Sequence, residues 1–181
     1  MPMSLTLRSF VPAAAALSLA ALAATAFAAA HGGMAVPEPV RVPAGHKVAL
    51  ETVGVGEITY ECRTKDGAHA WVFAGPDAEL RGRDGQRIGR YFGPPATWQA
   101  ADGSAITGKQ LAVAPGGDGN IPLQLVEANP ATGAGRMQGV THVQRLATRG
   151  GVAPATTCDA SRMGAKEIVR YQADYVFWTK G

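Results

Sequence analysis

The chain has 181 residues, with 17 lysines and arginines against 14 aspartates and glutamates, which gives a formal net charge of +3. That length suits one domain with a hydrophobic core. The small excess of positive charge excludes the dense cationic stripe that nucleic-acid binding needs, so we expect no nucleic-acid partner.

Residues 1–30 have the layout of a secretory signal. Arg8 and the amino terminus provide a positive start, an apolar run follows, and small residues precede two candidate cleavage sites, after Ala28 and after Ala30. An uncleaved membrane anchor is the alternative, but the run is rich in alanine and is broken by Pro12. We therefore expect a secreted or periplasmic protein that is not inserted in a membrane after cleavage.

The segment that follows the signal, residues 31–43, contains Pro37, Pro39 and Pro43. Proline fixes its own φ angle and cannot donate a backbone hydrogen bond, so this segment is predicted to be a stiff, extended lead-in and not a helix. Residues 44–180 form the predicted domain.

Apolar and polar residues alternate through much of this domain, which is typical of half-buried strands. In the stretch "EITYECR", Ile58, Tyr60 and Cys62 point one way and the charged residues point the other. The preceding "KVALETV" also predicts a strand, and "GVG" at 54–56 is interpreted as a tight turn between the two.

The remaining domain has the turn residues of a β-meander. Asp-Gly pairs at 84–85 and 102–103 predict two hairpin turns, because glycine there supplies positive φ angles. A later strand is expected to carry a bulge at Gly139, and one short helical turn is expected near Ser161. About nine or ten mostly antiparallel strands predict an all-β sandwich or partly closed barrel.

Two cysteines, Cys62 and Cys158, remain after signal cleavage. A disulfide is the default for two cysteines in an oxidising compartment, and it would hold the irregular segment around Cys158 on the body of the domain. The alternative is that Cys62 is a nucleophile with His69 as its base, which would require Cys158 to stay unpaired.

The aromatic residues could form a stacking surface for a sugar or another flat ligand. The group consists of Tyr60, Trp71, Tyr91, Phe92, Trp98, Tyr175 and Trp178. Trp98 lies in "GPPATWQAADGS", so Tyr91, Trp98, Asp102 and Ser104 are the candidate ligand-binding residues. The alternative is that these aromatic side chains are the core of a small all-β domain.

His31, His69 and His142 are weaker candidates for a metal site. If cleavage occurs after Ala30, the amine and the ring of His31 could chelate copper together with a second histidine. A disordered terminus is the alternative interpretation. No serine-hydrolase, dinucleotide-binding or zinc-protease motif is present, and no cofactor is expected.

Several phrases together resemble one known family: "GEITYEC", "AWVFAGPDAEL", "YFGPPATWQAADGSAITG", "MQGVTHVQRLATRGGVAP" and "YQADYVFW". The chain is similar from Val36 to Trp178 to the secreted family called domain of unknown function 3455 (DUF3455). The resemblance implies an exported single domain with no agreed activity, cofactor or catalytic residue. It also fits a pairing of Cys62 with Cys158.

These observations favour a non-catalytic module that binds a carbohydrate or another small molecule. Two alternatives stay open: a copper enzyme that uses histidines, and a structural protein of the cell envelope.

Overall fold

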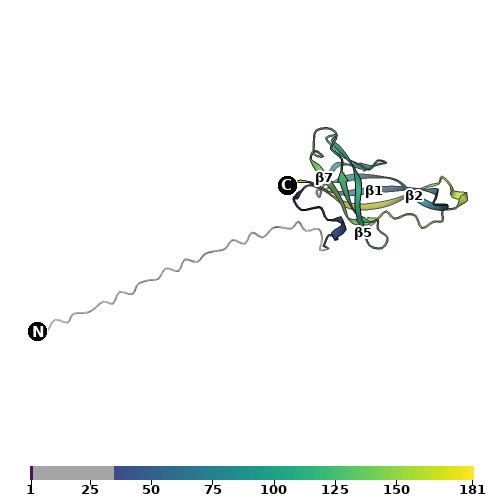
Figure 1. The fold of residues 1–181 in the computed structure, drawn as a ribbon, viewed down its shortest axis with the longest axis horizontal. Coiled ribbons are helices and arrows are strands. Elements are labelled where there is room, and N and C mark those ends of the chain that lie inside the picture. The colour runs from purple at the N-terminus through teal and green to yellow at the C-terminus, as the bar shows by residue number, and fades with distance from the viewer. Residues whose placement is uncertain (2–34) are drawn as a thin grey trace. The chain divides into compact units, whose positions relative to one another are not determined.

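Eight strands hydrogen-bond in chain order and close into an antiparallel barrel (Figure 1). They are β1 (His46–Lys65), β2 (Ala68–Arg81), β3 (Arg87–Phe92), β4 (Thr97–Ala100), β5 (Ala105–Ala114), β6 (Leu123–Ala128), β7 (Val140–Gly150) and β8 (Lys166–Lys180). The computed structural model describes Met1 and residues 35–181. The predicted export signal beyond Met1, its cleavage sites and His31 therefore lie outside the described residues. The all-β prediction is confirmed, and the barrel is one of the two expected architectures.

The predicted number of strands was too high because β1 runs unbroken through Gly54, Val55 and Gly56. The turn predicted at these residues is wrong. Neither glycine has a positive φ angle, and a Cβ atom at Gly54 would lie 2.5 Å from Cε2 of Tyr175. Glycine is needed at position 54 because the ring of Tyr175 occupies the space beside it, and not because the chain reverses there.

The hairpin turns are placed as predicted, while two local details differ. Gly85 and Gly103 have φ angles of 80° and 88° in the β2–β3 and β4–β5 turns. Gly139 precedes β7, and the irregularity in pairing falls just after it, between Val140 and His142, so the predicted bulge position was wrong. The short helical turn near Ser161 is present as η2 (Ala160–Arg162).

Large aromatic and aliphatic side chains fill the interior of the barrel. Tyr175 and Phe177 are fully buried. Small residues on neighbouring strands make room for them, because an eight-stranded barrel is just wide enough for its own side chains. The interior cluster comprises Ile58, Tyr60, Ala78, Leu80, Tyr91, Trp98, Ala100, Ile106, Ile121, Val126, Met137, Val140, Val143, Tyr171, Ala173, Tyr175 and Phe177.

The described part of the lead-in, residues 35–43, packs against the outer wall of the barrel. It was expected to be extended, but residues Glu38–Val40 form a 3-10 turn, η1, that buries Val40 completely. Val40 joins an outer cluster with Leu125, Leu146 and Val176. Gln144 donates a hydrogen bond of 2.6 Å to the Val40 carbonyl, so the lead-in is held by a polar contact as well as by apolar burial.

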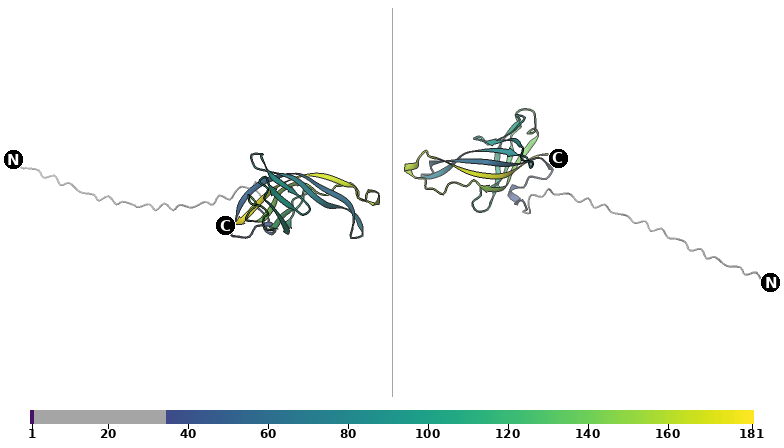
Figure 2. Two further views of the ribbon diagram at one scale, coloured as in Figure 1. Left: turned by 90° about the horizontal axis from the view of Figure 1, so that it is seen from above. Right: turned by 180° about the vertical axis from the view of Figure 1, so that it is seen from behind.

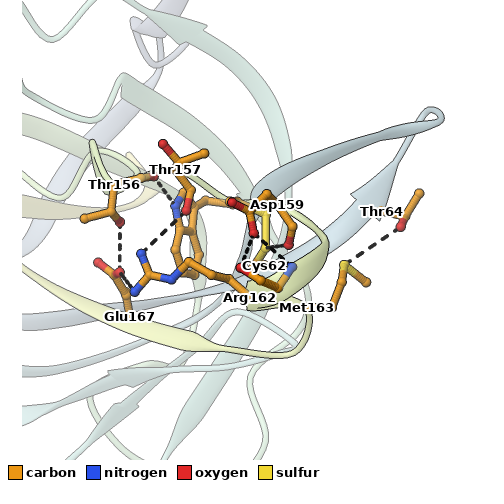
Figure 3. Close-up of a disulfide and its surroundings, with 11 residues drawn as sticks. Cys62, Thr64, Thr156, Thr157, Asp159, Arg162, Met163 and Glu167 are labelled. Atoms are coloured by element: carbon orange, nitrogen blue, oxygen red, sulfur yellow. Dashed lines mark hydrogen bonds and ion pairs between the residues drawn. A yellow bond between two sulfur atoms is a disulfide. The ribbon is translucent and has the colours of Figure 1, made fainter.

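The strands β1, β2 and β8 are longer than the others and project from one end of the barrel (Figure 2). The segment between β7 and β8 lies on this projection and is tied to it by the disulfide Cys62–Cys158, with 5.5 Å between the Cα atoms (Figure 3). The Trp71 indole also donates to the Thr156 carbonyl at 2.7 Å, and Arg162 pairs with Glu167. The predicted disulfide is therefore confirmed.

Candidate functional site

The two aromatic residues predicted to bind ligand lie inside the barrel. The rings of Tyr91 and Trp98 stack with their centroids 4.7 Å apart, and only 5% and 1% of their surfaces are exposed. Tyr175 packs against both rings. The stacking surface expected of Trp98 is therefore not formed, and the alternative, that these aromatics are core, is the arrangement found.

The other two predicted site residues, Asp102 and Ser104, form a clamp at the turn between β4 and β5. Asp102 Oδ1 accepts hydrogen bonds from Ser104 Oγ at 2.6 Å and from Ser104 N at 3.0 Å, and Oδ2 accepts one from Arg136 N at 2.9 Å. Ser104 Oγ in turn accepts from Met137 N. The clamp therefore fixes the β6–β7 loop so that Met137 enters the interior cluster.

The clamp also determines the chemistry of the Asp102 carboxylate. The Ser104 hydroxyl, with the backbone N–H groups of Arg136 and Ser104, holds the pKa of Asp102 below its usual range, because these donors favour the charged form. A carboxylate that stays ionised and accepts bonds on both oxygens is poorly suited to be a general acid.

A pocket of about 380 Å³ lies beside this clamp. Its wall is formed by the start of β3 and by three connections that are distant in sequence: the β2–β3 turn, the β4–β5 turn and the β6–β7 loop. Its lining residues are Asp84, Gln86, Arg87, Ile88, Ala101, Asp102 and Arg136. Asp102 is the only one of them that was predicted to be a site residue, so sequence reasoning found one edge of the pocket.

The carboxylates of the pocket have hydrogen-bond partners within the protein, whereas its arginines form no ion pair with another described residue. Asp84 Oδ1 accepts from the backbone N–H of Gln86, and Asp102 accepts from three donors. In contrast, none of the ion pairs in residues 35–181 involves Arg87 or Arg136. Within that range Arg87 and Arg136 therefore line the pocket without a close ion pair, although the charge of Arg136 acts at longer range on Asp102. Guanidinium matches carboxylate, sulfate and phosphate oxygens geometrically.

A broader groove of about 580 Å³ runs over the outer faces of β1, β7 and β8. Arg149 and Arg170 line it, but Arg170 lies directly opposite Glu57 in the strand register. The groove also contains the exposed Val55, and all of its walls are strand faces with no loop around them. It is a weaker candidate than the pocket between the turns.

The cysteine and histidine hypotheses have separate outcomes. Because Cys62 is paired with Cys158, the proposal of a Cys62 nucleophile is wrong. His69 lies exposed on the projecting hairpin, opposite Thr64, and His142 lies near the start of β7 at the other end of the barrel. These two predicted metal candidates are not brought together.

A histidine that was not a candidate, His46, meets His142 instead, with the ring centroids 4.8 Å apart. In the part of the chain that the structure describes, no group of three or more histidine, cysteine, aspartate or glutamate side chains is arranged to hold a metal ion. Within the same residues, no helix has the length and apolar composition of a transmembrane span.

The model of the family described as "Protein of unknown function (DUF3455)" matches residues 43–179, which confirms the resemblance seen in the sequence. Comparisons with curated proteins and with solved structures found no significant match.

Proposed function

We propose that this chain, which belongs to the DUF3455 family, is a non-catalytic binding module that holds a small anionic molecule, such as an acidic sugar, in the pocket at the β2–β3 and β4–β5 turns. The observation that carries the proposal is the difference between the two kinds of charge in that pocket. Its carboxylates already accept hydrogen bonds from the protein, whereas the guanidinium groups of Arg87 and Arg136 have no ion-pair partner among the described residues.

The composition of the wall supports a small polar ligand. Ile88 and Ala101 contribute an apolar part, and the Gln86 amide adds a neutral donor and acceptor. Binding pockets commonly combine apolar lining with a few convergent polar groups that set orientation. A volume of about 380 Å³ lies within the range of small-molecule pockets.

The pocket supports binding better than catalysis. A hydrolase would need a general acid or base poised near neutral pH, or an activated nucleophile. The hydrogen bonds to Asp102 lower its pKa and keep it ionised, and Ser104 Oγ is buried and engaged with Asp102 and Met137. Asp102 lines the pocket but stays ionised, and the Ser104 hydroxyl is engaged, so neither side chain is suited to donate a proton to a ligand.

Isothermal titration calorimetry tests the proposal with oligosaccharides of hexuronic acids against neutral oligosaccharides of the same linkage and length. We expect heat of binding only for the acidic series, with an affinity that falls as salt is added. Arg87→Ala and Arg136→Ala should each weaken binding by about tenfold, which corresponds to the loss of one charge-assisted hydrogen bond of about 1.5 kcal/mol.

Arg149→Ala is the matched control, because it removes an exposed arginine from the outer groove and leaves the pocket intact. Equal effects of Arg87→Ala and Arg149→Ala would indicate a general charge effect and would count against the pocket. Absence of binding to the acidic series and to simple carboxylates and sulfates would refute the proposal.

The proposal places the protein outside the cytoplasm, secreted or in the periplasm. A disulfide between Cys62 and Cys158 is compatible with an oxidising compartment, and residues 1–30 have the charge and hydropathy pattern of an export signal. Amino-terminal sequencing of the exported protein tests this, with a start at Ala29 or His31 expected. A retained Met1 would contradict it.

A further inference from the structure

Two histidines from distant parts of the sequence meet on the outer wall of the barrel. His46 begins β1 and His142 lies near the start of β7, and they flank the end of β8, where they pair in register with Lys180 and Trp178. The two rings are 4.8 Å apart between centroids and nearly perpendicular, with an interplanar angle of 85°. Neither ring belongs to the pocket described above.

In each ring, the Nδ1 atom lies within hydrogen-bond distance of a neighbouring oxygen. His46 Nδ1 lies 2.9 Å from the Pro43 carbonyl oxygen, which can only accept, so this nitrogen carries the proton. His142 Nδ1 lies 3.1 Å from Thr141 Oγ1, and that hydroxyl donates its own proton to the Trp178 carbonyl. The His142 Nδ1 atom therefore also carries a proton and donates it to Thr141.

This arrangement leaves the Nε2 atom of both rings as a lone-pair donor. No hydrogen bond to either Nε2 atom occurs within the described residues. A histidine whose Nδ1–H is held by an oxygen is the usual form of a metal ligand, because the second contact fixes the tautomer and the ring orientation.

We propose that His46 and His142 form a binding site for a divalent ion of the later first-row transition metals, Cu²⁺, Ni²⁺ or Zn²⁺, coordinated by the two Nε2 atoms. Imidazole is a preferred ligand for these three ions. The site is distinct from the anion pocket and does not depend on it.

Glu127 is the side chain placed to complete the site. It lies directly opposite His142 in the register of β6 and β7, is exposed, and is close enough to act electrostatically on His142. Directly opposed residues on antiparallel strands have Cβ atoms about 4.5–5.5 Å apart, within the reach of a glutamate carboxylate after a change of rotamer. Because no third ligand is already in place, water would fill the remaining positions, and the site would be open.

Titration of the full chain with Cu²⁺, Ni²⁺ and Zn²⁺ tests the site by calorimetry, in a His31→Ala background so that His31 cannot provide a ligand. We expect one equivalent to bind, most tightly for Cu²⁺ as the general order of stability requires. His46→Ala and His142→Ala should each abolish measurable binding of Ni²⁺ and Zn²⁺. Thr141→Val, which removes the hydroxyl that holds His142 and also bonds the Trp178 carbonyl, should weaken binding by about tenfold or more.

His69→Ala is the matched control, because His69 is an exposed histidine on the projecting hairpin, and this variant should bind as the parent does. Broadening of imidazole NMR signals by Ni²⁺ gives a second measurement that needs no substitution, and it should affect His46 and His142 but not His69. Loss of binding in His69→Ala, unchanged binding in His46→Ala and His142→Ala, or equal broadening of all three rings would overturn the proposal.

Discussion

Replacing Cys62 and Cys158 together with alanine removes the covalent link between β1 and the segment between β7 and β8. The two residues are 96 positions apart, and the chain-entropy model assigns about 4.7 kcal/mol to a loop of about 100 residues, although measured values are typically about 2–4 kcal/mol. We expect the double variant to lose about 2–4 kcal/mol of unfolding free energy. A domain of this size loses about 2–4 °C in melting temperature per kcal/mol, so the midpoint should fall by roughly 5–15 °C.

Urea unfolding followed by tryptophan fluorescence measures this loss, and reduction of the wild-type chain is the control that changes no residue. The reduced protein and the double variant should unfold at similar urea concentrations. Hydrogen exchange reports the local part of the effect, because Gly164 N–H donates to the Cys62 carbonyl at 2.9 Å beside the disulfide. Faster exchange at Gly164 is expected in both forms. An unchanged urea midpoint would show that the crosslink does not stabilise the fold.

Two further predictions concern the interior of the barrel. Gly54→Ala should lower the unfolding free energy by about 1–3 kcal/mol, because its Cβ atom would press on the buried Tyr175 ring 2.5 Å away. Val55→Ala, at the exposed neighbouring residue, should change the unfolding free energy by less than about 0.5 kcal/mol. Equal urea midpoints for the two variants would contradict this prediction. All four tyrosines of the chain have raised pKa values, chiefly because burial disfavours the phenolate. A raised folded-state pKa means that the stabilisation is complete below the unfolded value of about 10 and is lost as pH rises above it. Tyrosinate absorbance should therefore appear only together with unfolding in an alkaline titration, and ionisation of any tyrosine near pH 10 in the folded protein would refute the assignment.

The glycines show what the sequence can and cannot predict about this fold. Gly85 and Gly103 follow aspartate, and their positive φ angles form the predicted turns. Gly54 and Gly56 were interpreted in the same way, yet they lie within a continuous strand. A glycine that a turn requires has local neighbours that reveal it, whereas one required by a ring on another strand depends on a contact more than 100 residues away.

The disulfide and the core followed from general rules, while the pocket did not. The expected oxidising compartment and the presence of two cysteines predicted the disulfide between Cys62 and Cys158. The alternation of apolar and polar residues predicted the burial of Ile58 and Tyr60. Asp102 could be marked as turn chemistry, but its bond to the backbone of Arg136 joins two loops that only the barrel brings together.

The arginines near the β2–β3 turn show the same limit. Arg81, Arg83 and Arg90 pair with acidic residues, at Glu79, Glu51 and Asp77. Arg87 has no ion pair in the described part of the chain and lines the pocket. Composition alone cannot distinguish it from the other three, because the difference lies in which acidic residues the strand register places beside each one.

The filled interior decides where this barrel can hold a ligand. An eight-stranded barrel either encloses one small molecule or fills its interior with its own side chains. Here the stacked rings of Tyr91 and Trp98, together with Tyr175 and Phe177, occupy that space and are almost completely buried. A ligand in the centre would have to displace these rings, at a cost of several kcal/mol for each large side chain removed from the core. The connections between strands are therefore the better place for binding, which is where the pocket lined by Arg87 and Arg136 lies.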